Sequence, residues 1–100
     1  EFEARDLSNM AWSVALLGVR DRPLLDAIAA AARRNITDFN PQALANTAWS
    51  WARLLLPDAP LLYALAAQSI KTIHEFQAQN LANTAWAIAT LELAQSIKTI

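Results

Sequence analysis

Five residue types recur in one register at intervals of 37 positions along this chain of 100 residues. The recurring sets are Phe2, Phe39 and Phe76; Leu7, Leu44 and Leu81; Asn9, Asn46 and Asn83; Ala11, Ala48 and Ala85; and Trp12, Trp49 and Trp86. The segment 44–49, Leu-Ala-Asn-Thr-Ala-Trp, also returns letter for letter at 81–86. Such a period is typical of repeat proteins, in which each unit buries its apolar face against the next unit.

The second unit shows how the first helix of each unit should begin. Asn40 is a suitable N-cap. Pro41 suits the first helical position, because the backbone N–H there has no partner within the helix and proline has no N–H. Phe39 and Leu44 flank this cap with the spacing of a hydrophobic staple. A helix is therefore predicted from Pro41 to about Leu55. The same staple is expected in the other units, as Phe2 with Leu7 and Phe76 with Leu81.

A second helix should follow in each unit. Pro57 and Pro60 interrupt the first helical pattern, and Asp58 can cap a helix that runs from about Ala59 to Ile73. Asp21 occupies the same register in the first unit and opens its second helix. Short turns into the next unit are expected at 37–38 and 74–75.

These features predict an all-α protein, specifically an α-solenoid of stacked antiparallel helical hairpins with a 37-residue repeat. A single segment, 1–100, would hold about two and a half repeats, with bounds 2–38, 39–75 and, for the partial third repeat, 76–100. Hydrophobic residues make up 55% of the chain, above the usual fraction of about 45–50%. We therefore expect neighbours, either adjacent repeats of the same chain in a longer array or partner proteins.

The end of the chain departs from this period. The segment 67–73, Ala-Gln-Ser-Ile-Lys-Thr-Ile, reappears at 94–100, an offset of 27 rather than 37 positions. Residues 92–100 therefore either continue the first helix of the third repeat or add a short second helix.

Several classes of function are disfavoured by composition. The net charge of −1 gives no overall basic field, and the lack of cysteine excludes disulfides and thiolate zinc sites. His74 is the only histidine, so no second one completes a metal site or a catalytic pair. No apolar run reaches the roughly 18 residues that a membrane span needs. We expect no catalytic residue, cofactor, metal or small-molecule substrate.

Polar side chains share one side of the first helix in each repeat, at positions i, i+4, i+8 and i+11. Amides both donate and accept hydrogen bonds and so suit base edges, while arginine can hold phosphate or stack on a base. An alternative is that the repeated asparagines form hydrogen bonds between adjacent helices and fix the angle between repeats. This alternative is favoured by their identity in all repeats, because residues that read a base sequence must vary from repeat to repeat. The candidate contact residues are Arg5, Asn9, Gln42, Asn46, Ser50, Arg53, Gln79, Asn83 and Thr90.

The tryptophans of the repeat, Trp12, Trp49 and Trp86, are interpreted as packing between hairpins, because large aromatic side chains dominate core energetics. Stacking platforms for bases are the alternative. Trp51 has no aromatic counterpart in the other repeats, so we expect it at the surface, as part of an interface.

The segments 39–49 and 76–86 resemble the octotricopeptide repeat of algal organelle proteins and its 37-residue relative in alveolates, the heptatricopeptide repeat. The resemblance covers nearly the whole chain. It implies an α-solenoid that binds single-stranded RNA in a chloroplast or mitochondrion and acts in RNA processing, stability or translation. Some members of these families are structural subunits of organellar ribosomes.

Two functions are therefore carried forward. The first is a non-enzymatic scaffold that binds organellar RNA. The alternative is a protein–protein interaction module or structural subunit of a large organellar assembly, such as a ribosome or a photosynthetic membrane complex. In either case we expect an organellar protein, soluble or peripherally attached, without a transmembrane segment.

Overall fold

The computed structural model describes residues 3–56 and 58–99, and their side chains as far as Ile97. Five α-helices and two short 3-10 helices form this part of the chain, which contains no strand, so the predicted all-α class is confirmed. In order, the elements are α1 (Ala4–Leu17), α2 (Arg22–Arg34), η1 (Ile36–Asp38), α3 (Pro41–Leu54), α4 (Ala59–Lys71), η2 (Ile73–Glu75) and α5 (Ala78–Thr99).

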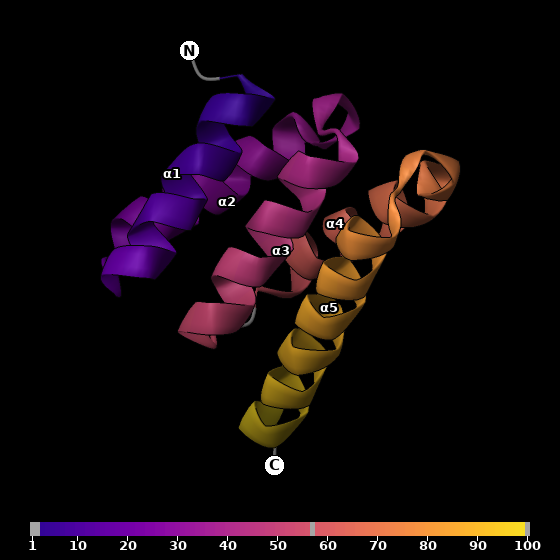
Figure 1. Cartoon of the computed structure of the whole chain (residues 1–100). Helices are drawn as coiled ribbons and strands as arrows, with labels where there is room; N and C mark the ends of the chain where they lie inside the picture. Colours follow the sequence, from indigo (N-terminus) through magenta and orange to yellow (C-terminus); the bar gives the residue numbers. More distant parts are fainter. Residues whose placement is uncertain (1–2, 57, 100) are drawn as a thin grey trace.

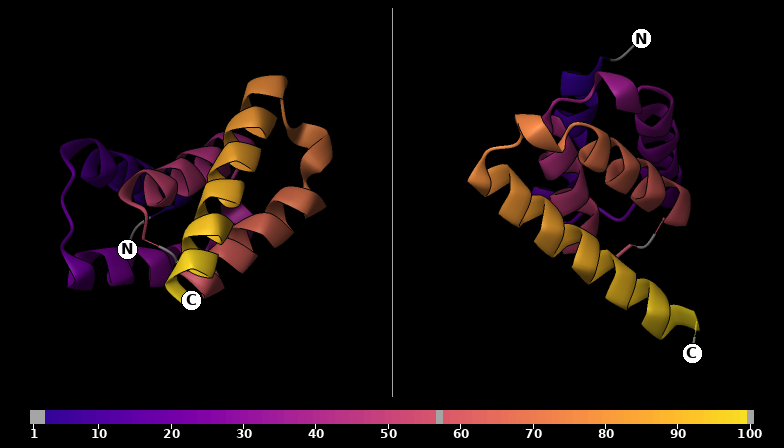
Figure 2. Two further views of the ribbon diagram at one scale, coloured as in Figure 1. Left: turned by 90° about the horizontal axis from the view of Figure 1, so that it is seen from below. Right: turned by 90° about the vertical axis from the view of Figure 1, so that its right-hand side faces the viewer.

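The helices lie in two layers. One layer holds α1, α3 and α5 side by side, with α3 packed closely against both of its neighbours, and α2 and α4 lie behind it (Figure 1). Figure 2 shows the two layers from below and the long α5 helix from the side. In the first layer, α1 and α5 therefore occupy the two edges (Figure 1).

The bounds of the elements recur along the chain. α3 begins and ends 37 positions after α1, and α4 begins and ends 37 positions after α2. The α5 helix begins 37 positions after α3 but runs on to Thr99, eight positions beyond the equivalent end point. Residues 92–99 therefore continue α5, the helix that was expected to open the third repeat, as in one of the two alternatives, and residue 100 lies outside the described part.

The predicted helix starts are confirmed. The side chains of Asp21, Asn40 and Asp58 each accept a hydrogen bond from the backbone N–H three residues further on, at 3.1, 2.8 and 3.0 Å. Phe39 and Leu44 of the predicted staple are both buried in the core. The other staples are less complete, because Leu81 is exposed and Phe2 lies outside the described residues.

Trp51 belongs to the core, so the prediction that it lies at the surface is wrong. Only 3% of it is exposed, and Val14 and Ile88, which occupy its register on α1 and α5, also pack against the core. All three residues are apolar. The register therefore marks the core-facing side of the first helix, and the lack of an aromatic counterpart was a misleading signal.

The α1 and α3 helices end in the same left-handed conformation, at Gly18 with φ 70° and at Leu55 with φ 52°. At both ends two backbone N–H groups bond back to the last turn, including Gly18 N to Ala15 O and Leu55 N to Ala52 O, each 3.1 Å. Glycine adopts this backbone conformation without steric cost, whereas a residue with a Cβ atom adopts it only with steric strain. Leu55 therefore holds a strained position that its glycine counterpart does not.

We predict that Leu55→Gly raises the free energy of unfolding by up to about 1 kcal/mol, because the left-handed strain is relieved. Little burial is lost, since Leu55 is exposed. The converse change, Gly18→Ala, should lower stability by about 1 kcal/mol, although a Cβ there would contact nothing within 4 Å. Urea denaturation followed by circular dichroism measures both changes. Changes of the same sign in the free energy of unfolding of the two variants would contradict the role assigned to the left-handed conformation.

The tryptophans provide a second test. Trp51→Ala should lower the free energy of unfolding by about 3–5 kcal/mol, because it empties a buried site. Trp86→Ala is the matched control, since Trp86 is 53% exposed, and should cost well under about 2 kcal/mol when measured at low protein concentration. Similar losses for the two variants would mean that burial does not determine their contributions.

Candidate functional site

Several of the predicted contact residues lie on the exposed side of the α1, α3 and α5 layer. Arg5 and Asn9 come from α1, Gln42 from the first turn of α3, and Gln79 and Asn83 from α5, and all five are exposed. Their arrangement follows from the helical period, because residues four apart lie on the same face of a helix.

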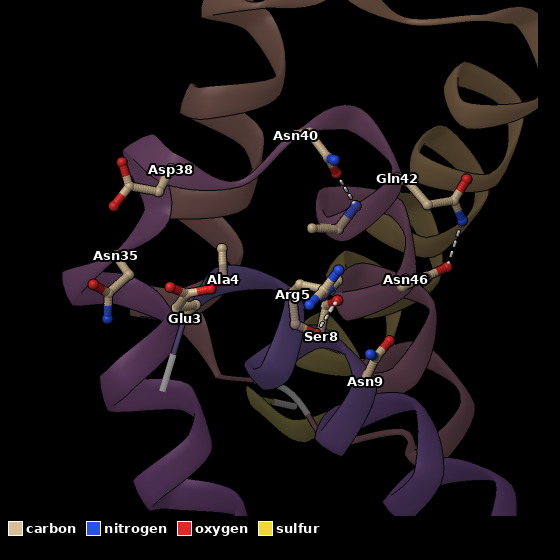
Figure 3. Close-up of a pocket in the computed structure, with 11 residues that line it drawn as sticks. Glu3, Ala4, Arg5, Ser8, Asn9, Asn35, Asp38, Asn40, Gln42 and Asn46 are labelled. Carbon is tan, nitrogen blue, oxygen red and sulfur yellow. Dashed lines mark hydrogen bonds between the residues drawn. The ribbon is translucent and has the colours of Figure 1, made fainter. Parts of the chain in front are cut away.

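A groove of about 850 Å³ runs between the start of α1 and the start of α3 (Figure 3). Four of the predicted contact residues line it, two from each helix. The connection between α2 and α3 supplies a third wall. The lining residues are Glu3, Ala4, Arg5, Ser8, Asn9, Asn35, Asp38, Asn40, Gln42, Ala43 and Asn46.

Hydrogen bonds hold the Gln42 side chain at the edge of this groove. Its Nε2 donates to Asn46 Oδ1 at 2.9 Å, as Figure 3 shows, and its Oε1 accepts from Asn80 Nδ2 at 3.4 Å. The second bond joins α3 to α5. Among the described residues the asparagines at 9, 46 and 83 do not bond to one another, so the alternative of an asparagine ladder between helices is not what forms.

Arg5 and Asn9 make no side-chain hydrogen bond within the described part of the chain. Their donors and acceptors therefore face the groove unpaired. Glu3 and Asp38 contribute two carboxylates to the lining against the single guanidinium of Arg5. A groove with this composition offers amides and little positive charge, so it favours neutral polar groups, such as base edges, over phosphate.

Two tryptophans stack across the α1–α3 contact. The rings of Trp12 and Trp49 have centroids 4.3 Å apart and planes inclined by 30°. The guanidinium carbon of Arg53 lies 5.7 Å from the centre of the Trp49 ring, within the range of a cation–π contact. The predicted packing between hairpins therefore holds for this pair. It is wrong for Trp86, which is 53% exposed.

Ser50 is fully buried, so its predicted place on the exposed polar side is wrong. Its hydroxyl donates to Asn46 O at 2.7 Å. Each residue turns the helix by about 100°, so a residue eight positions after Gln42 is rotated by about 80° from it. That rotation carries Ser50 into the contact with α1. Thr90 on α5 similarly donates to Trp86 O of its own helix, at 2.8 Å.

The predicted residues thus separate into groups. Arg5, Asn9, Gln42 and Asn46 share the groove, Arg53 lies with the stacked tryptophans, and the α5 residues lie outside the groove. Sequence reasoning missed Asn35, Asp38 and Asn40 as lining residues. Their only signal was polarity beside a predicted turn and cap, and that signal does not reveal a groove.

Other kinds of site find little support. In residues 3–56 and 58–99, no three histidine, aspartate or glutamate side chains are grouped as metal ligands would be. His74 lies 3.6 Å from Glu75, and both side chains are largely exposed. Within the same residues, no helix has the length and apolarity to cross a bilayer.

Comparison with known proteins matches the sequence of this chain to one family. The model of one family, described as RNA-editing substrate-binding complex 6 protein (RESC6), matches residues 1–96, nearly the whole chain. No curated protein and no solved structure matches the chain. The match agrees with an RNA-related helical protein and does not confirm the octotricopeptide type of repeat. The chain belongs to the RNA-editing substrate-binding complex 6 family.

Proposed function

We propose that this protein is a non-enzymatic scaffold of an RNA-editing substrate-binding assembly and that it contacts single-stranded RNA with the exposed side of α1, α3 and α5. The observation that carries this proposal is the convergence of Arg5, Asn9, Gln42 and Asn46 on one groove. The family supplies the RNA-related context.

The architecture proposed for this scaffold is an α-solenoid of the octotricopeptide or heptatricopeptide type, with repeats at 2–38, 39–75 and 76–100. Its support is the 37-residue spacing between the bounds of α1 and α3 and between those of α2 and α4. Side-by-side repeats would set their exposed polar sides in a row, the arrangement that repeat proteins use to read RNA with a few side chains for each base.

The residues have different proposed roles. Asn9 and Gln42 would hydrogen-bond base edges in the groove, because amides offer both donors and acceptors. Arg53 would contact phosphate from its position over Trp49, and the exposed Trp86 offers a ring for stacking. Since the net charge is −1, we expect few phosphate contacts and a shallow dependence of affinity on salt.

The same assignment bears on location. A role in an RNA-editing complex favours the mitochondrion over the chloroplast among the two organelles expected from the repeat. Protein subunits of the same assembly are the second candidate for partners, because Tyr63 and Ile70 on α4 are 66% and 73% exposed. Loss of association with the assembly after nuclease treatment would favour RNA as the direct partner, and retention would favour protein.

The test of RNA contact is fluorescence anisotropy with a labelled, unstructured single-stranded RNA at several salt concentrations. Arg53→Ala should weaken binding and reduce the slope of log affinity against log salt by about 1, because one phosphate contact is lost. Arg22→Ala is the matched control. It removes the same charge from α2, where Arg22 is paired only with Asp26 at 3.8 Å, and should leave both affinity and slope unchanged.

The Gln42→Ala variant distinguishes hydrogen bonds to bases from electrostatic attraction of phosphate. It should weaken binding several-fold without altering the salt slope, because an amide contact to a base releases no counterion. Absence of RNA binding by the unaltered protein at low salt would contradict the proposed RNA contact. Equal weakening by Arg22→Ala and Arg53→Ala would contradict the assigned surface.

A further inference from the structure

A chain of side-chain amides joins the start of α5 to the groove between α1 and α3. Asn80 Oδ1 accepts a hydrogen bond from the backbone N–H of Gln77 at 3.2 Å, and Asn80 Nδ2 donates to Gln42 Oε1 at 3.4 Å. Gln42 Nε2 donates in turn to Asn46 Oδ1 at 2.9 Å (Figure 3). We call the side chains of Asn80, Gln42 and Asn46 the amide relay. Gln42 and Asn46 line the groove, whereas Asn80 does not.

The first bond of the amide relay fixes the orientation of every amide in it. The backbone N–H of Gln77 can only donate, so Asn80 turns its oxygen toward that N–H and its Nδ2 toward Gln42. Gln42 accepts with its oxygen and therefore directs Nε2 to the next amide. Asn46 accepts with Oδ1, and its Nδ2 makes no hydrogen bond with a described residue. The relay thus ends in a hydrogen-bond donor on the wall of the groove.

The α1 wall of the groove adds donors of its own. The guanidinium of Arg5 can only donate, and it makes no side-chain hydrogen bond within the described residues. The position that Asn80 occupies on α5 is held by Ala43 on α3, 37 residues earlier. A methyl group cannot bond to Arg5, so no second relay between α1 and α3 occupies this guanidinium. Donors from both helices therefore face the same space.

We propose that the amide relay makes the groove selective for bases that carry a carbonyl oxygen where other bases carry an amino group. This inference rests on the proposed contact of the groove with RNA. Uracil and guanine present an acceptor at the position where cytosine and adenine present an amino donor. A donor of the groove forms a hydrogen bond with the carbonyl oxygen, whereas opposite an amino group it stays unpaired, which costs free energy. Asn80 is a positioning residue, because it acts on the base through Gln42 and Asn46.

The amide relay predicts that Asn80→Asp reverses this selection. An aspartate can still accept from the backbone N–H at the start of the helix, as Asp6 does at the equivalent position of α1 with a bond of 3.3 Å. The second carboxylate oxygen only accepts, so Gln42 must turn over and donate its Nε2 to it. Gln42 Oε1 then accepts from Asn46 Nδ2. Asn46 is left with Oδ1, an acceptor, toward the groove.

The experiment is fluorescence anisotropy with short labelled oligomers of uridine and of cytidine, each titrated separately at low salt. The two bases have the same size and differ in the carbonyl or amino group at one position. The unaltered chain should bind the uridine oligomer about fivefold more tightly, the contribution of one hydrogen bond. Asn80→Ala removes the anchor of the relay and should bring the two affinities together. Asn80→Asp should bind the cytidine oligomer more tightly.

The matched control is Gln77→Glu, which makes the same change from amide to carboxylate at the same end of α5. The Gln77 side chain is exposed and lies outside the amide relay, so the added charge should weaken binding of both oligomers by the same factor. Circular dichroism checks that all variants keep their helix content.

The outcomes separate this inference from the proposed function. An Asn80→Asp variant that still prefers uridine would overturn the role of the relay. Equal binding of the two oligomers by the unaltered chain would overturn the selectivity and leave the RNA contact standing. Binding of neither oligomer by the unaltered chain would overturn the proposed RNA contact and the selectivity together.

Discussion

The close side-by-side packing of α1, α3 and α5 is the contact on which the other features depend. It is possible because small residues, such as Ala11 and Ala48, occupy the contact and are almost completely buried. Thr47 and Ser50 lie in the same contact and donate their hydroxyls to carbonyls of their own helix, at 2.8 and 2.7 Å, so no partner across the interface is needed. The same spacing brings the Trp12 and Trp49 rings into a stack and places polar side chains of adjacent helices around one groove.

Features that depend on chain neighbours could be predicted from sequence. The caps at Asn40 and Asp58 involve a backbone N–H only three residues away, so the local sequence is enough to predict them. The places of Ser50, Trp51 and Trp86 were predicted wrongly, because each depends on which neighbouring helix covers that side of its own helix. A repeat pattern predicts the same burial for equivalent positions. At the edge of a layer this prediction fails, because a helix there has a neighbour on one side only.

The candidate groove was predictable only in part, for a related reason. Helical spacing placed Arg5 with Asn9 and Gln42 with Asn46, and the repeat placed the two pairs in the same register. Helical spacing could not supply the wall from the α2–α3 connection, where Asp38 joins Glu3 in setting two carboxylates against the single positive charge of Arg5. That balance changes the chemistry of the groove from attraction of phosphate to hydrogen bonding of neutral polar groups.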